Sequence, residues 1–211
     1  MFGIKKIVGL ILVVGGLFGF SLFKSGVSQE NLLSVSIQQN FCRFHKNKKE
    51  CRTLYKNKFA QNNFTLHGLW PQPRSRHDCS NRYDRLKSNL WSELKVKMPG
   101  VVSGLAKHEW RKHGSCYGKS EREYFKDSLK LLDDVNKGEL RDFIFSHKGK
   151  VVTKQQIKSV LKYPRKVQLV CKRGYISEIR FSLKGDVSKN SLEELQKGAK
   201  SLRGGCQRGK I

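Results

Sequence analysis

Six cysteines limit the folds open to this 211-residue chain more than any other property of its sequence. They stand at positions 42, 51, 79, 116, 171 and 206. An even number of cysteines spread along a chain is typical of proteins that fold in an oxidising compartment, where thiols are joined as disulfides. No two of them form a Cys-x-x-Cys pair, so neither a zinc knuckle nor a thioredoxin-like motif is indicated. We therefore expect three disulfides, whose pairing the spacing alone leaves open.

The N-terminal residues are a second indication of export. Lys5 and Lys6 precede an uncharged run over residues 7–23, and Lys24 ends it. The run is longer than the apolar core of a usual signal peptide, about 7–15 residues, and barely reaches the ~17 residues needed to span a bilayer. Residues 1–28 are therefore interpreted as a signal peptide or a retained membrane anchor, with cleavage favoured. In both cases the body is expected to be periplasmic or secreted.

The body is strongly basic. The chain has 43 Lys and Arg residues against 17 Asp and Glu residues, a net charge of +26 at pH 7 and far more than solubility requires. Such a charge attracts polyanions, of which nucleic acid is the commonest. A cationic protein that binds acidic surfaces or anionic lipid without any chemistry fits the charge equally well. Charge therefore indicates a class of partner and leaves the reaction open.

Strands are predicted near both ends of the body. Apolar and polar residues alternate over 33–37, 64–67, 167–171 and 175–183, as they do in half-buried strands. The last two runs flank Lys172-Arg173-Gly174 and therefore predict a hairpin. The serines between the apolar residues of 33–37 are expected to lie on the polar face of that strand.

Helices are predicted between these strands. Apolar residues recur with helical spacing over 85–97, 105–113 and 120–135. Capping-box patterns occur at two places, Ser120 with Glu123 and Thr153 with Gln156. Residues 43–58 are expected to form a solvated basic loop that also attracts phosphate, and the stretch from 186 a polar tail. The fold class predicted is α+β, a single domain with a central, mostly antiparallel sheet and packed helices.

The segment 108–113, His-Glu-Trp-Arg-Lys-His, has the composition of a catalytic site. On a helix, residues 108, 109, 112 and 113 fall within an arc of roughly 140°, so two imidazoles, a carboxylate and an ammonium share one face. A zinc site is not indicated, because the histidines are five residues apart instead of four and a lysine beside a cation opposes its binding. The alternative, a solvated helix face with ion pairs, is weakened by a third histidine, His67, at the end of an alternating strand.

Two long motifs make the sequence similar to the ribonuclease T2 family. The first reads Phe64-Thr65-Leu66-His67-Gly68-Leu69-Trp70-Pro71-Gln72. The second reads Lys107-His108-Glu109-Trp110-Arg111-Lys112-His113-Gly114-Ser115-Cys116. They occur in the family's order and spacing, and the likeness extends from the strand at 33–37 to Cys206. The resemblance therefore covers nearly the whole body, and residues 29–211 are expected to be a ribonuclease T2-like catalytic domain.

The resemblance implies a role for each matching residue. His113 would be the general base that takes the proton of the ribose 2′-hydroxyl, and His67 the general acid that protonates the leaving 5′-oxygen. Glu109 and Lys112 would stabilise the phosphorane. Substrate binding would fall to three residues, Trp70, His108 and Lys112. The implied disulfides are Cys42–Cys51, Cys79–Cys116 and Cys171–Cys206.

Elementary chemistry agrees with these roles. Attack of the 2′-oxygen on phosphorus needs a base on one side and an acid on the other, and histidine, with a pKa of about 6.5, can serve as either. The expected reaction cleaves single-stranded RNA with broad base specificity to a 2′,3′-cyclic phosphate, followed by a 3′-phosphate if water attacks the ring. It requires no metal and no cofactor, its pH profile is bell-shaped, and DNA, which lacks the 2′-hydroxyl, is not cut.

Two other hypotheses remain open. A catalytically silent, cationic RNA-binding protein on the same fold would keep the charge without the chemistry, although the intact motif residues argue against it. A membrane-anchored toxin would retain residues 7–23 as a tether. We expect a monomer whose partner is its RNA substrate. Five residues outside the motifs are expected to be solvated or to serve packing: His45, His77, His147, Tyr83 and Tyr117.

Overall fold

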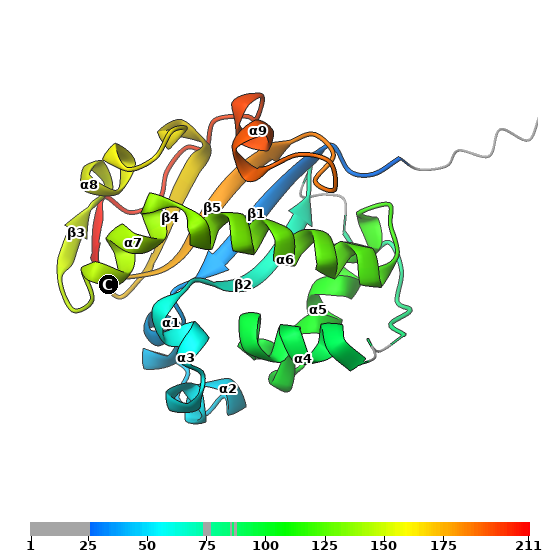
Figure 1. Cartoon of the computed structure of the whole chain (residues 1–211), viewed down its shortest axis with the longest axis horizontal. Helices are drawn as coiled ribbons and strands as arrows, with labels where there is room; N and C mark the ends of the chain where they lie inside the picture. The colour runs from blue at the N-terminus through cyan, green and yellow to red at the C-terminus, as the bar shows by residue number, and fades with distance from the viewer. Residues whose placement is uncertain (1–25, 74–76, 85, 87) are drawn as a thin grey trace, which may run out of the picture.

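The computed structural model describes residues 26–73, 77–84, 86 and 88–211 (Figure 1). These residues form one domain with a six-stranded sheet and nine α-helices, so the expected α+β fold is confirmed. Of the predicted leader, residues 1–28, only the last three are described, and the apolar run 7–23 lies outside the described residues. Among the residues that the structure describes, no helix has the length and apolar character needed to cross a membrane.

The sheet is mostly antiparallel, as predicted. In spatial order its strands are β2 (Thr65–Pro71), β1 (Glu30–Ser36), β5 (Tyr175–Lys184), β6 (Arg208–Lys210) and β3 (Val151–Thr153), with β4 (Val167–Lys172) paired to β5. Every pairing is antiparallel except the short one between β5 and β6. Strand β5 is central, because it pairs with β1, β4 and β6. The predicted hairpin is the β4–β5 pair.

The long helix α6 (Glu121–Lys137) lies across one face of the sheet (Figure 1). Its predicted capping box is present, since Ser120 accepts from the backbone N–H of Glu123 and the Glu123 carboxylate accepts in return. Its apolar residues, among them Phe125 and Leu132, are buried in the core. The other helices are α1 (Gln38–Arg43), α2 (Lys49–Arg52), α3 (Lys58–Asn62), α4 (Ser88–Lys97), α5 (Leu105–Lys112), α7 (Glu139–Ser146), α8 (Lys154–Ser159) and α9 (Leu192–Lys197).

Short 3₁₀ helices connect several of these elements. They are η1 (Leu54–Lys56), η2 (Pro99–Ser103), η3 (Gly114–Cys116) and η4 (Pro164–Lys166). The basic segment 43–58, predicted to be a loop, contains α2, η1 and the start of α3. The polar stretch after 186, predicted to be a tail, contains α9 and β6. Both predictions missed elements of six residues or fewer, because such short elements carry too few apolar residues to show a period.

The serines of β1 lie in surroundings that alternation did not predict. Ser34 and Ser36 are buried, as are Leu33 and Val35 on the other face. The strand has no solvated face, because its serine side is covered by polar groups of the site described below. Ser34 Oγ donates a hydrogen bond of 3.2 Å to Glu178 Oε2 on the neighbouring strand.

The three expected disulfides are present. They join Cys42 to Cys51, Cys79 to Cys116 and Cys171 to Cys206. The second of them ties the segment 77–84 to η3, directly after α5. In the same region the backbone N–H of Asp78 donates to the carbonyl of Lys112 at 3.0 Å. The C-terminal end of α5 is therefore held in place by a covalent link and a backbone hydrogen bond.

Candidate active site

The two sequence motifs meet where β2 passes the C-terminal half of α5. Strand β2 carries His67 and Trp70, and α5 carries Glu109. The helix ends at Lys112, and His113 is its C-cap residue with φ −129° and ψ −53°. The helix therefore ends one residue earlier than predicted, although the backbone N–H of His113 still donates to the Glu109 carbonyl at 3.0 Å. His113 stays with the other motif residues, because its ring and the Glu109 carboxylate both contact Trp70.

Glu109 is buried at the centre of the site and is 1% exposed. Its Oε2 accepts a hydrogen bond of 2.7 Å from the indole Nε1 of Trp70. Its Oε1 lies 3.7 Å from His67 Nε2 and 4.0 Å from His108 Nε2. Burial raises the pKa of Glu109, although the charge of His67 and the indole hydrogen bond act in the opposite direction.

Gly68 permits this close approach of strand and helix. A Cβ at position 68 would lie 2.0 Å from Glu109 Oε2 and 2.7 Å from Trp70 Nε1. Both distances are far inside van der Waals contact, so any side chain there would displace the carboxylate or the indole. The position after His67 in the first motif therefore requires glycine for steric reasons.

Helix α6 fixes β2 from the other side. The buried hydroxyl of Tyr124 accepts from the backbone N–H of Leu69 at 3.3 Å and donates to the Leu69 carbonyl at 2.9 Å. Tyr124 also packs against Gly114, where a Cβ would lie 2.8 Å from its ring. One tyrosine therefore positions the strand that bears His67 and the turn that follows His113.

His67 lies between two carboxylates. Its Nδ1 is 3.0 Å from Glu178 Oε1, and because a carboxylate oxygen accepts, Nδ1 carries the hydrogen of this bond. Its Nε2 is on the side of Glu109. Burial lowers the pKa of His67, but the hydrogen bond to Glu178 and the charges of Glu178 and Glu109 outweigh burial, and the pKa is raised above 6.5.

Glu178 is the residue of the site that sequence reasoning missed. Its Oε2 accepts from Arg180 Nη2 at 3.0 Å and from Ser34 Oγ at 3.2 Å. Burial alone would raise the pKa of Glu178, but His67 and Arg180 lower it to about 2. A carboxylate and a guanidinium two residues apart on one strand point to the same face. That pair, on a strand predicted to be part of the sheet, was the signal that could have identified it.

The pKa of His113 shifts in the opposite direction. Burial is the largest cause, and the positive charges of Lys112, His108 and His67 add to it, so that the pKa of His113 is lowered to about 4. Its ring packs against the indole of Trp70, with ring centroids 5.4 Å apart. The two histidines therefore differ in protonation state over a range of pH between their two pKa values.

His108 and Lys112 lie at the solvent edge of the site. The His108 side chain is 59% exposed, and burial of its remainder and the charge of Lys112 lower its pKa. Lys112 is exposed as well. Both side chains are thus accessible to a bound anion. Glu109, which is buried, and Trp70, which is partly buried, lie beneath them.

A pocket of about 340 Å³ opens beside His67. It is lined by His67, His108 and Glu178, together with other residues that include Phe41, Lys48 and Leu105. Its size is within the range of small-molecule sites, about 300–1,000 Å³, and suits a nucleoside. In the described ranges, no three His, Cys, Asp or Glu side chains are grouped so that they could hold a metal ion.

The residues expected to be structural are found outside this group. Tyr117 is fully buried and donates to Asp127 Oδ2 at 2.9 Å, which confirms a packing role. His77 is exposed beside Asp78. His45 and His147 are only partly solvated, because each ring stacks on a phenylalanine four residues earlier and bonds that residue's carbonyl.

Comparison with known proteins gives one consistent result. The model of the ribonuclease T2 family matches residues 31–196. Ribonuclease I of Escherichia coli (strain K12) is 24% identical over 200 residues, which covers 74% of this chain and 75% of the relative.

Two solved structures of similar fold are of plant ribonucleases. The self-incompatibility associated SF11-RNase of Nicotiana alata has a TM-score of 0.58 at 22% identity, over 77% of this chain and 89% of that one. A mutant of RNase MC1 from bitter gourd seeds, solved in complex with 5′-UMP, has a TM-score of 0.58 at 23% identity, over 79% of this chain and 92% of that one.

Proposed function

The chain belongs to the ribonuclease T2 family and is a T2-type endoribonuclease, and we propose that it cleaves single-stranded RNA by two-histidine catalysis that needs no metal. The observation that carries this proposal is the placement of two histidines in one site: His67 Nδ1 lies 3.0 Å from Glu178 Oε1, and the His113 ring packs against the Trp70 indole with centroids 5.4 Å apart. The pKa of His113 is lowered to about 4 and that of His67 is raised above 6.5. Groups whose surroundings separate their pKa values in this way are suited to act as base and acid at the same pH.

The proposed reaction begins with proton removal by His113. Neutral His113 takes the proton of the ribose 2′-hydroxyl while the 2′-oxygen attacks phosphorus. The bond from phosphorus to the 5′-oxygen breaks, and protonated His67 gives its proton to that oxygen. The products are a 2′,3′-cyclic phosphate and a free 5′-hydroxyl. Hydrolysis of the ring to a 3′-phosphate would use the same two residues with their roles exchanged.

The remaining motif residues are proposed to bind the reacting phosphate. Lys112 and His108 present donors at the exposed edge of the site, where negative charge grows on the phosphoryl oxygens. Glu109, whose pKa is raised by burial, can donate a hydrogen bond when protonated and holds Trp70 in place. The pocket beside His67 would receive the leaving nucleoside, because His67 protonates the oxygen of that nucleoside.

We also propose that residues 1–28 direct export and that the mature catalytic domain begins near residue 29. Residues near this point belong to the folded body, since the backbone N–H of Ser28 donates to the Tyr117 carbonyl at 2.9 Å. Three disulfides agree with a periplasmic or secreted location. Determination of the N-terminal residue of the protein from expressing cells is expected to give Val27, Ser28 or Gln29. An intact Met1 would favour the membrane-anchored form.

The function is tested with one RNA oligonucleotide and its DNA counterpart, in the presence of EDTA. We expect cleavage of the RNA to a 2′,3′-cyclic phosphate and no cleavage of the DNA. The value of kcat/KM should rise with pH through about 4, as His113 loses its proton, and fall above 6.5, once His67 loses its own.

The control is the same RNA with a single 2′-deoxy sugar at the cleaved position, which should be bound and left intact. A rate that rises steadily to about pH 9 would contradict two-histidine catalysis, because no second group would then need its proton. A protein that binds RNA and cleaves none of it over this range would instead be a cationic RNA-binding protein.

A further inference from the structure

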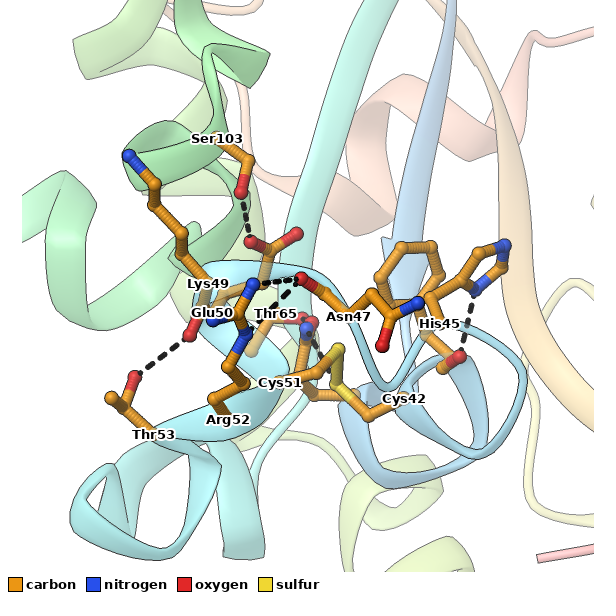
Figure 2. The surroundings of a disulfide bond; sticks show 12 residues. Cys42, His45, Asn47, Lys49, Glu50, Cys51, Arg52, Thr53, Thr65 and Ser103 are labelled. Carbon is orange, nitrogen blue, oxygen red and sulfur yellow. Dashed lines mark hydrogen bonds between the residues drawn. A yellow bond between two sulfur atoms is a disulfide. The ribbon is translucent and has the colours of Figure 1, made fainter.

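A second surface of the protein concentrates positive charge without acidic partners. Figure 2 shows the Cys42–Cys51 disulfide, which closes a short loop. This loop carries Arg43, Lys46 and Lys48, all of them exposed. The turn between β4 and β5 adds Lys172 and Arg173, which are exposed as well. We name this set of five residues the basic groove. A hollow of about 600 Å³ lies between the loop and Arg173.

Aromatic side chains hold the cations of the basic groove in place. Lys172 Nζ and Arg173 Cζ lie 5.8 Å and 5.5 Å from the centroid of the Phe44 ring. Arg43 Cζ lies 4.6 Å from the centroid of the Tyr175 ring. Cation–π contacts of this kind restrain long side chains, so less freedom is lost when an anion binds them.

His45 adds a further restraint. Its Nδ1 bonds the Phe41 carbonyl at 2.8 Å, and since a carbonyl only accepts, Nδ1 carries the hydrogen. The other nitrogen, Nε2, then accepts from Lys172 Nζ at 3.1 Å. Lys172 is thus positioned by the imidazole of His45.

The one acid of the loop does not neutralise these charges. Glu50 is buried, and its carboxylate accepts a hydrogen bond from Ser103, on the opposite side of the loop from His45 (Figure 2). In the described part of the chain, no cation of the basic groove is within ion-pair distance of a carboxylate. Uncompensated charges of one sign repel one another, and a bound polyanion removes that repulsion.

The basic groove adjoins the catalytic site at Lys48. Lys48 lines the pocket beside His67 and His108, and it also lines the hollow that ends at Arg173. A strand of RNA whose nucleotide occupies the pocket therefore meets Lys48 first and the other cations beyond it.

We propose that the basic groove binds the phosphates of the RNA strand on the 3′ side of the cleaved bond. This proposal rests on the function proposed above, because the role of His67 as general acid decides which side of the cleaved bond lies toward the basic groove. His67 protonates the leaving 5′-oxygen, so the nucleotide beside it, and all that follow through Lys48, belong to the 3′ product. The enzyme therefore grips long RNA by its downstream segment and depends on it for affinity.

The test compares three RNA substrates: a dinucleotide, the same dinucleotide with three nucleotides added at its 3′ end, and the same with three added at its 5′ end. The groove variant is Lys46→Glu with Arg173→Asn. Asparagine tolerates the left-handed conformation of Arg173, φ 48°. The matched control, Lys197→Glu with Arg203→Asn, makes the same change in charge at exposed residues of α9 and the loop after it.

For the wild type and the control, we expect the 3′ extension to raise kcat/KM about tenfold, chiefly through KM, and the 5′ extension to have little effect. In the groove variant the gain from the 3′ extension should be lost while cleavage of the dinucleotide is unchanged. The slope of log kcat/KM against log salt concentration is negative, and in the groove variant it should become shallower by about 0.7 for each phosphate contact removed.

Three results would overturn the proposal: a gain that comes from the 5′ extension, a gain that survives in the groove variant, or equal losses in the groove variant and the control. A groove variant that loses only its affinity for anionic lipid vesicles would assign the surface to a membrane instead. Binding of a 3′-extended oligonucleotide with a 2′-deoxy sugar at the cleaved position separates this proposal from the proposed function, because it needs no catalysis.

Discussion

Replacement of His113 by alanine is expected to lower kcat for RNA cleavage by about 10²–10⁴-fold while leaving RNA binding nearly unchanged. A positioned general base contributes a factor of this size, and the ring of His113 is held in place against Trp70. The measurement is single-turnover cleavage at pH 6, combined with equilibrium binding of an RNA that has a 2′-deoxy sugar at the cleaved position.

The chain provides a matched control for this variant. His147 is the C-cap residue of α7, as His113 is of α5, and its ring is also partly buried. His147→Ala should therefore reproduce any loss of stability that comes from removing an imidazole at a helix end, and it should keep full activity. Equal activity losses in the two variants would contradict a catalytic role for His113.

The acid and the base can be told apart in the same experiment with His67→Phe. A uridine 3′-aryl phosphodiester has a leaving group that departs without a proton, so it makes the general acid unnecessary. This substrate should restore much of the activity of the His67 variant and none of that of the His113 variant. The reverse pattern would show that the two roles are exchanged.

Glu178→Gln is expected to lower kcat/KM near pH 7 by about 10²-fold and to move the alkaline limb of the pH profile to lower pH. The glutamine oxygen can still accept from His67 Nδ1, but the negative charge that raises the pKa of His67 is lost. Because His67 must be protonated to act, a lower pKa removes the active form at a lower pH. The acidic limb, which depends on His113, should stay near pH 4.

The readout of this prediction is the full pH profile of kcat/KM and not one rate. Glu30→Gln is the control, since Glu30 also lies in the sheet and pairs with a cation, Lys200, at 2.7 Å. A purely structural role for Glu178 would lower the rate equally at every pH and leave both limbs in place, which would refute a positioning role. Glu178→Asp keeps the negative charge on a shorter side chain. It should return the alkaline limb part of the way to its wild-type pH.

The sequence was most informative where a site is local. His67 with Trp70 and Glu109 with His113 each lie within a few residues of one another, so motif and chemistry identified them together. Glu178 could not be found in this way, because 111 residues separate it from His67 and only the pairing of β1 with both β5 and β2 brings it near. Long-range strand pairing is the information that a local pattern lacks.

A similar limit explains the error in the predicted surroundings of β1. The serines of β1 were placed on a polar face, which is correct, but a polar face buried beneath a catalytic site cannot be distinguished from a solvated one by alternation. The hairpin of β4 and β5 was predicted correctly because its turn is chemically marked. Arg173 and Gly174, at φ 48° and 79°, have the positive angles of a tight hairpin turn.

The position of β5 late in the chain determines when the site can form. The His67–Glu178 contact and the central pairing of β1 with β5 both join early residues to late ones, and β6 pairs with β5. A fold with such distant contacts forms slowly and only after most of the chain has been released. A polypeptide still emerging from a ribosome or a translocation channel has no assembled site. Because His67 and Glu178 cannot meet before β5 has been made, the assembled site requires the chain up to Lys184.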